Sequence, residues 1–171
     1  MQVRIEHISP RHAKDTWAFR DNAKLWEFMD CDTPLPATQR GDATYYKQMR
    51  DDPRCRMFAI VVGDMAVGCC QLHNIANGAA EMRYYVLDED LWGKGICTKA
   101  VNKLVDYGFD ELGLDLIYRY VNVRNVGSMR VAEKQKFAKV GISFINPEVV
   151  RLEMTRTGWE RQRKNQSKTT K

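Results

Sequence analysis

The sequence lacks the features of several protein classes. Its five cysteines form no C-x-x-C pair and show no zinc-ligand spacing with its three histidines, so neither a metal site nor a disulfide framework is expected. The longest apolar run, residues 57–62, is far too short to span a bilayer. The N-terminal residues contain no basic segment followed by an apolar one, so no secretory signal is expected. The cysteines therefore indicate small, reduced core residues of a cytoplasmic protein.

The chain also lacks a linker and an internal repeat, and it carries no net charge outside its last eleven residues. Its 171 residues are 44% hydrophobic and 29% charged, which is typical of one globular domain. Of the 27 basic residues, five lie in the acid-free segment 161–171, which leaves 22 basic against 22 acidic residues elsewhere. We therefore expect a domain over residues 1–160 and a flexible basic tail over 161–171. A neutral body argues against dedicated nucleic-acid binding, and no membrane association is expected.

What the chain does contain is an antiparallel meander followed by a parallel crossover. Three segments are typical of strands: 57–62, 65–72 and 80–87. Gly63-Asp64 and Asn77-Gly78 separate them and supply the positive φ angles that tight hairpins need. A helix over 96–112 then leads to a strand over 116–123, so the two strands flanking this helix should be parallel.

The remaining elements complete a mixed sheet. Strands are expected at 3–8, 137–142 and 149–155, and helices near the N-terminus, over 38–49 and over 125–136. Ser9-Pro10 is typical of a helix start, and two short helices should meet near Asn22. The sequence thus predicts a mixed α/β (α+β) fold of about seven strands flanked by helices.

A glycine loop precedes the central helix. The segment 91–98 reads Leu-Trp-Gly-Lys-Gly-Ile-Cys-Thr, and its amides should lie at a helix N-terminus, where a phosphate is favoured. Lys94 and Lys99 add positive charge. The same glycines also fit a plain strand-to-helix turn. A Walker loop is absent, and a Rossmann fingerprint would need a third glycine and a parallel unit, so a dinucleotide-binding dehydrogenase is disfavoured.

Four ordered segments carry a family resemblance: 80–87, 91–100, 106–114 and 125–134. Together they resemble the GNAT acetyltransferase superfamily, and most closely its branch of ribosomal-protein alanine/serine N-terminal acetyltransferases and their small-amine relatives. The similarity runs from about residue 2 to about residue 160. It implies acetyl-CoA as the acetyl donor, bound where two parallel strands of a GNAT-like sheet splay apart.

The resemblance also implies which residues bind the donor. The pyrophosphate signature falls on the glycine loop, and the pantetheine arm on backbone groups at the end of the preceding strand. An asparagine contact to the donor falls on Asn125, which equally fits a helix cap. The implied set is Tyr85, Val86, Leu87, Trp92, Gly93, Lys94, Gly95, Ile96, Cys97, Thr98 and Asn125. No metal is expected.

Two residues are the candidates for catalysis. Glu81 lies where several GNAT relatives place a glutamate base, but a structural glutamate paired with Arg83 fits the same position. Many relatives protonate the leaving thiol with a tyrosine, and that position here is Ala132. Ser128 occupies a position from which the ribosomal branch often faces the thiol, although a serine in the first turn of a helix explains it equally. A backbone N–H near Val86 or Leu87 is the implied oxyanion donor.

The acceptor side is the least specified part. The resemblance places it near 22–36 and 144–147, and Glu27, Asp30 and Asp32 fit either a cation-attracting cluster or a solvated surface. The aromatic residues Trp17, Trp26, Tyr45 and Tyr46 fit a pocket or core packing. The leading hypothesis is an N-acetyltransferase acting on a protein α-amine or a small amine such as a polyamine or amino sugar, by direct attack in a ternary complex. The alternative is a catalytically inactive GNAT fold that binds acyl-CoA or ribosomes. A homodimer is compatible with either.

Overall fold

One mixed sheet organises the protein. The computed structural model describes residues 1–20, 22–28 and 38–169. Within these ranges seven strands form a sheet in the order β1-β2-β3-β4-β5-β7-β6. The strands are β1 (Val3–His7), β2 (Arg56–Val62), β3 (Met65–Ala76), β4 (Ala79–Val86), β5 (Leu116–Asn122), β6 (Ala138–Ile142) and β7 (Val149–Thr155). Every neighbouring pair is antiparallel except β4 and β5, which are parallel. The predicted fold class is confirmed.

Tight turns join the strands of the meander. Gly63 has a φ of +59° between β2 and β3, and Asn77 and Gly78 have φ angles of +50° and +73° between β3 and β4. Two consecutive positive φ angles are what a two-residue hairpin of this twist requires, and they suit Asn-Gly. The two turns therefore lie where the sequence predicts them, and β3 runs four residues beyond its expected end.

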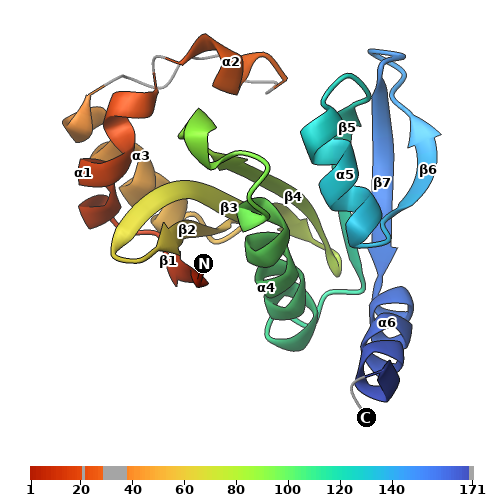
Figure 1. The fold of residues 1–171 in the computed structure, drawn as a ribbon. Helices are drawn as coiled ribbons and strands as arrows, with labels where there is room; N and C mark the ends of the chain where they lie inside the picture. Colours follow the sequence, from red (N-terminus) through yellow and green to blue (C-terminus); the bar gives the residue numbers. More distant parts are fainter. Residues whose placement is uncertain (21, 29–37, 170–171) are drawn as a thin grey trace.

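The parallel pair separates soon after it forms. β4 and β5 are paired only from Ala79 to Glu81 on one strand and from Leu116 to Tyr118 on the other. Beyond these residues the strands diverge toward their C-terminal ends, which Figure 1 shows as a widening gap between β4 and β5. The C-terminal edge of a parallel pair is where open α/β sheets bind ligands, so the divergence positions a site.

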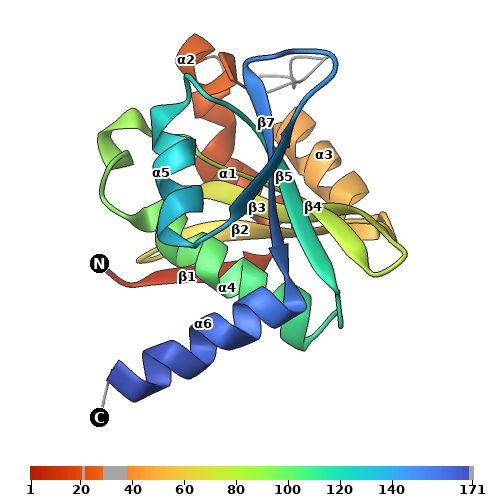
Figure 2. The ribbon, with the colours of Figure 1, turned by 90° about the vertical axis from the view of Figure 1, so that its right-hand side faces the viewer.

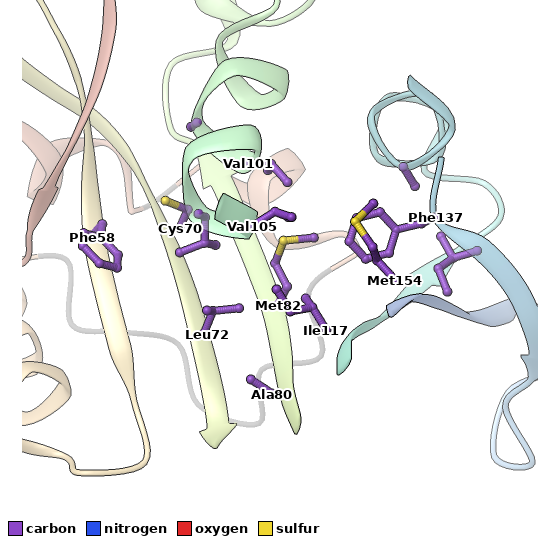
Figure 3. Packing of buried hydrophobic residues seen from close by; sticks show 14 of the residues in the cluster. Phe58, Cys70, Leu72, Ala80, Met82, Val101, Val105, Ile117, Phe137 and Met154 are labelled. Atoms are coloured by element: carbon purple, nitrogen blue, oxygen red, sulfur yellow. The ribbon is translucent and has the colours of Figure 1, made fainter. Parts of the chain in front are cut away.

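Helices cover both faces of the sheet. The α-helices are α1 (Ala13–Thr16), α2 (Ala23–Trp26), α3 (Gln39–Asp51), α4 (Ile96–Asp110), α5 (Val126–Lys134) and α6 (Arg156–Thr169). α4 and α5 lie on one face and α3 on the other (Figure 2). The larger core packs α4 against the sheet through residues such as Met82, Val105 and Ile117 (Figure 3). A second core lies beneath α1 and α3 and includes Tyr46.

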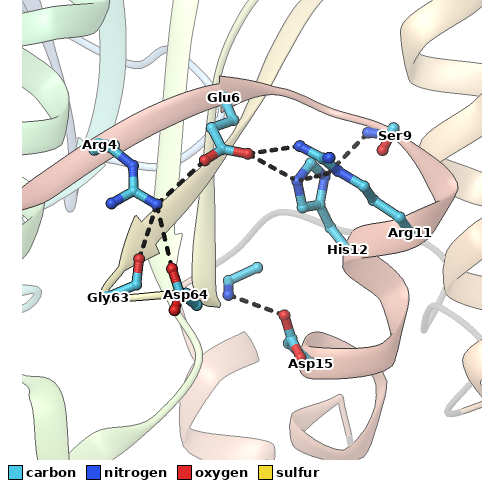
Figure 4. Close-up of polar contacts among 9 residues, drawn as sticks. Arg4, Glu6, Ser9, Arg11, His12, Asp15, Gly63 and Asp64 are labelled. Carbon is cyan, nitrogen blue, oxygen red and sulfur yellow. Dashed lines mark hydrogen bonds and ion pairs between the residues drawn. The ribbon is translucent and has the colours of Figure 1, made fainter.

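Polar contacts tie the N-terminal helices to the sheet edge (Figure 4). The backbone N–H of Ser9 donates to His12 Nδ1 at 3.2 Å, which closes a capping box at the short 3-10 helix η1 (Pro10–His12). Glu6 on β1 accepts from Arg11 at 2.7 Å. The predicted helix start at Ser9-Pro10 is confirmed. Asn22 caps α2, as its side chain accepts from the N–H of Lys24 at 3.0 Å.

The end of the chain differs from the expected frayed tail. Residues 161–169 continue α6, which begins at Arg156, so the expected boundary at residue 160 falls inside a helix. Three polar contacts hold this helix against α4: Arg156 donates to the carbonyl of Phe109 at 2.9 Å, Trp159 Nε1 donates to Asp106 at 2.8 Å, and Arg163 pairs with Asp110 at 2.8 Å. A charged helix with so few apolar residues carries no amphipathic pattern, so no hydrophobic periodicity predicts it. No helix in the described ranges is long and apolar enough to cross a membrane.

Candidate active site

A cleft of about 1180 Å³ opens where β4 and β5 diverge. Its walls come from β4, β5, the start of α5 and the β6–β7 hairpin. Glu27 and residues 144–146, expected on the acceptor side, are among the lining residues. Asp30 and Asp32 lie outside the described residues. The cleft therefore brings together segments that are more than a hundred residues apart in the sequence.

The glycine loop lies at the N-terminal end of α4. Gly93 and Gly95 have φ angles of +73° and +77°, and Gly95 is the N-cap of the helix. A Cβ at either glycine would meet no described atom within 4 Å, so the backbone is open to a ligand there. The first turn of α4 holds no acidic residue, and no described side chain caps it. The first N–H groups of a helix lack intrahelical partners, and the loop with Ile96, Cys97 and Thr98 thus fits an anion such as a pyrophosphate.

The two lysines near the loop differ in their surroundings. Lys94 is exposed within the loop, so its charge is available to a ligand. Lys99 Nζ donates to the carbonyl of Met1 at 2.9 Å, which ties this side chain to the segment before β1. Of the two, Lys94 is the better placed to add charge at the loop.

At the end of β4, hydrogen bonds within the protein already use two of the backbone groups. Leu87 N–H donates to Val67 O at 2.9 Å, and Trp92 Nε1 donates to Val86 O at 2.8 Å. The N–H and C=O of one strand residue point to the same side, and the side alternates along the strand. Since the backbone N–H of Leu87 points toward β3, that of Tyr85 does so too, whereas the backbone N–H groups of Tyr84 and Val86 point away from β3. Leu87 is therefore not a free backbone donor, and Val86 is the one that remains. The Trp92 side chain is thereby tied to the end of β4.

Glu81 is held in an ion pair. Its Oε1 lies 2.9 Å from Arg83 Nε and 3.3 Å from His73 Nε2, and Asn74 donates to Oε2 at 3.4 Å. Burial raises the pKa of this carboxyl, but the adjacent His73 imidazole and the charge of Arg83 outweigh it and lower the pKa to about 2. Such a carboxylate is a weak proton acceptor. The geometry matches the Arg83 pairing that the sequence left open.

Asn125 and Ser128 lie together at the start of α5. Asn125 Oδ1 accepts from the N–H of Ser128 at 2.9 Å, so Asn125 is the N-cap of the helix. Ser128 Oγ lies 3.3 Å from the hydroxyl of Tyr84, and it accepts a hydrogen bond from Arg119. Both Asn125 and Ser128 line the cleft. The helix-cap interpretation of Asn125 is confirmed, and its contact with a donor stays a prediction.

Two cleft residues, Arg119 and Tyr84, were not predicted as site residues from the sequence. Arg119 is 5% exposed, and its NH1 donates to the Tyr84 hydroxyl at 2.7 Å. Its guanidinium carbon lies 4.5 Å from the centroid of the Tyr84 ring. A signal was available, because Arg119 stands between Ile117 and Val121 in the alternating pattern of β5. All three face the interior, and an arginine at an inward strand position is unusual.

The aromatic residues of the N-terminal segment surround a buried ion pair. Arg20 Nε lies 2.7 Å from Asp42 Oδ1, and both side chains are fully buried. The rings around the Arg20 guanidinium are those of Trp26, Tyr45, Tyr46 and Tyr85, with centroids 5.4–5.9 Å away. None of these four residues lines the described part of the cleft. Tyr46 is a buried core residue with Tyr45 packed against that core, Trp26 packs on Arg20 and Tyr85, and Trp17 is 37% exposed.

The cysteines in the described ranges behave as core residues. Cys55, Cys69 and Cys70 are buried free thiols, and Cys31 lies outside the described residues. Burial raises the pKa of Cys97, beside the glycine loop, to about 11. A neutral thiol at this position adds no charge to the loop.

Comparison with known proteins decides the family. The family described as "Acetyltransferase (GNAT) domain" matches residues 2–138. The chain belongs to the GNAT acetyltransferase family. The splayed β4–β5 pair and the glycine loop at the head of α4 are thus features of a GNAT domain. The family resemblance stated from the sequence is confirmed.

Individual relatives agree with this assignment. A probable N-acetyltransferase, YjcK, from Bacillus subtilis (strain 168) is 39% identical over 115 residues, which cover 65% of this chain and 64% of that protein. The spermidine N-acetyltransferase of Vibrio cholerae, solved with CoA and spermine, superposes with a TM-score of 0.78 at 20% identity over 92% of this chain and 98% of that one. Mycobacterium smegmatis RimJ, solved with a CoA-disulfide, gives 0.81 at 20% identity over 90% and 81%. At these identities the two structures establish the shared fold.

Proposed function

We propose that this GNAT chain transfers the acetyl group of acetyl-CoA to the α-amine of a peptide N-terminus, by direct attack in a ternary complex. The observation that carries the proposal is the open cleft between β4 and β5, with a glycine loop at the head of α4 whose amides no described side chain caps. An elongated donor with a phosphate at one end and a thioester at the other fits this arrangement. The fold neighbour from V. cholerae was solved with CoA, which agrees with such a donor.

The donor side rests on backbone groups. Acetyl-CoA supplies an activated acyl group when it is bound. Residues 93–98 would hold the pyrophosphate through N–H groups at the positive end of the α4 dipole. The backbone N–H of Val86 points away from β3 and would donate to the carbonyl oxygen as negative charge develops. Asn125 and Ser128 face the same cleft from α5.

The weak basicity of Glu81 favours an α-amine as acceptor. Neutralising a lysine-like amine at pH 7 costs about 4–5 kcal/mol, whereas an α-amine with a pKa near 8 costs about 1.4 kcal/mol. A carboxylate whose pKa is about 2 contributes little to the larger cost. We therefore assign Glu81 the role of a negative charge beside the incoming amine, and the amine's own low pKa supplies the reactive form.

The charges of the cleft also disfavour a polycation. Among the described lining residues there are three arginines and two glutamates. One of these glutamates, Glu81, already pairs with Arg83, and Glu27 lies 3.9 Å from Arg124. A polyamine needs several unpaired carboxylates, whereas a peptide N-terminus carries one amine and a neutral backbone. Phe144 and Ile145 are fully exposed beside the cleft and offer apolar contact to such a peptide.

A thiol-release assay tests the proposal. The protein is incubated with acetyl-CoA and with free N-terminal peptides, spermine or glucosamine, and free thiol is measured over time. We expect release with the peptides, rising with pH through the α-amine pKa near 8. The same peptides with a blocked N-terminus but an intact lysine are the matched control and should give no release.

Other outcomes would overturn the proposal in different ways. Faster release with spermine or glucosamine would replace the acceptor class but keep the acetyltransferase. Acetyl-CoA binding, measured by calorimetry, without release on any amine would support the inactive acyl-CoA-binding module instead. Absence of acetyl-CoA binding would remove both functions.

A further inference from the structure

Two arginines of the cleft, Arg83 on β4 and Arg151 on β7, have the same local arrangement. Arg83 Nε donates to Glu81 Oε1 at 2.9 Å, and Arg151 Nε donates to Glu153 Oε1 at 2.7 Å. In each pair the glutamate lies two residues away on the same strand, so both side chains project from one face of the sheet. The side chains of Arg83 and Arg151 are 41% and 33% exposed, and both residues line the cleft. Each guanidinium is therefore held by a glutamate on one edge and is accessible from the cleft.

The strand register brings these two arginines to the same region. Tyr118 on β5 lies opposite Glu81 on β4, and Tyr120 on β5 lies opposite Arg151 on β7. Residues paired across two strands project from the same face. Burial raises the pKa of the Tyr118 hydroxyl, and the charges of Arg151 and Arg83 both act to lower it. The two guanidiniums therefore lie near the same hydroxyl, and they approach it from the strands on either side of β5.

Both guanidiniums keep donors that the protein does not use. Within the described ranges, NH1 and NH2 of Arg83 and NH2 of Arg151 donate no hydrogen bond. Arg151 NH1 donates to the Tyr120 hydroxyl at 3.0 Å, and its guanidinium carbon lies 4.3 Å from the centroid of the Tyr118 ring. These contacts fix the orientation of the guanidinium before a ligand arrives. An oriented guanidinium binds a carboxylate through short, charge-assisted hydrogen bonds, so the unused donors fit such a ligand in the cleft.

We propose that Arg83 and Arg151 bind a carboxylate of the acceptor, so that the preferred acceptor is a peptide with Asp or Glu at its second or third residue. The inference rests on the proposed function, in which Glu81 lies beside the incoming α-amine. Glu81 and Arg83 are two residues apart on β4, which corresponds to about 7 Å along a strand. An extended peptide advances at the same rise, so an α-amine at Glu81 brings an acidic side chain of the second or third residue to the arginines. The order of charges along β4 thus matches an amine followed by an acid.

Pairs of matched peptides test the inference. The two peptides of a pair differ only in Asp or Asn, at the second residue in one pair and at the third in the other, and kcat/KM is measured by thiol release. The wild-type protein should acetylate the Asp peptide of at least one pair about 10-fold more efficiently, mainly through a lower KM. Arg151→Gln and Arg83→Gln should each reduce this preference toward one. Arg50→Gln is the matched control and should keep it, because Arg50 Nε also donates to a neighbouring carboxylate, of Asp51 at 2.9 Å, but lies on α3 outside the cleft lining.

A change of charge gives a second, stricter readout. Arg151→Glu should make a peptide with arginine at the same position a better acceptor than its Asp counterpart, and this variant decides the matter if Arg83→Gln releases Glu81 and loses activity on every peptide. Equal kcat/KM for the Asp and Asn peptides of both pairs in the wild-type protein would overturn the inference and leave the proposed function intact. A full preference for Asp retained in both Arg151→Gln and Arg83→Gln would also overturn it. No thiol release with any peptide would overturn the proposed function together with the inference.

Discussion

Asp42→Asn should destabilise the protein strongly because it leaves Arg20 as an unpaired buried charge. The two side chains are fully buried and 2.7 Å apart, and Asp42 Oδ2 also accepts from Thr16 Oγ1 at 2.8 Å. Removing one partner of a buried ion pair costs about 3–5 kcal/mol. For a chain of this length, about 2–4 °C of melting temperature is lost per kcal/mol. Urea denaturation and thermal unfolding should therefore both show a large loss, of roughly 6–20 °C in the thermal measurement.

The chain provides a matched control for this change. Asp110 pairs with Arg163 at 2.8 Å, but the two side chains are 47% and 53% exposed. Asp110→Asn removes the same charge from an equally short pair and should cost less than about 1 kcal/mol. The double variant Arg20→Met/Asp42→Leu should recover much of the loss, because apolar side chains remove the unpaired charge. Equal losses in Asp42→Asn and Asp110→Asn would refute the reasoning from burial.

Four further predictions concern the site and the chain end. Gly95→Glu should abolish the rise in melting temperature that acetyl-CoA produces, while Gly113→Glu, at an equally positive φ beyond the other end of α4, should retain it. Glu81→Gln should lower kcat less than the roughly 10²-fold typical of a lost general base, and a larger loss that shrinks as pH rises would make Glu81 the base. The pKa of Glu81 in the folded protein, about 2, lies below its ordinary value of 4.5. The loss of unfolding free energy in Glu81→Gln should therefore be largest at neutral pH, and it should decrease to zero as the pH falls from 4.5 to 2. Truncation after Glu160 should lower the melting temperature only slightly, since the buried Trp159 remains, and a loss as large as that of Asp42→Asn would contradict this.

The meander and the crossover could be predicted because their signals are local. Asn77-Gly78 adopts the two positive φ angles that its residue types favour, and Gly113 has a φ of +65° beyond the last turn of α4. The helical spacing of Val101, Leu104 and Val105 places these residues in the core. Such features depend on neighbours within a few residues, so the sequence contains them directly.

The chain end could not be predicted in the same way. α6 has no apolar stripe, and its position depends on Asp106 and Asp110, which lie about fifty residues earlier on α4. A contact between residues so far apart in the sequence produces no hydrophobic periodicity within α6. The expectation of a frayed end followed from composition alone, and the contacts with α4 account for the difference.

By itself, the sequence determined the order of the strands and of the helices before α6, the family resemblance and the glycine loop, because turn residues, hydrophobic periodicity and motif spacing are properties of neighbouring residues. Only the tertiary structure decided the direction of the backbone groups and the hydrogen bonds in the site. It turned Leu87 N–H toward Val67 and left the N–H of Val86 pointing away from β3, since strand pairing fixes the direction of backbone groups. It also joined Tyr84, Arg119 and Ser128 across the gap between β4 and β5. Hydrogen bonds between residues 9 to 44 positions apart depend on how the sheet diverges, and no local pattern encodes that divergence.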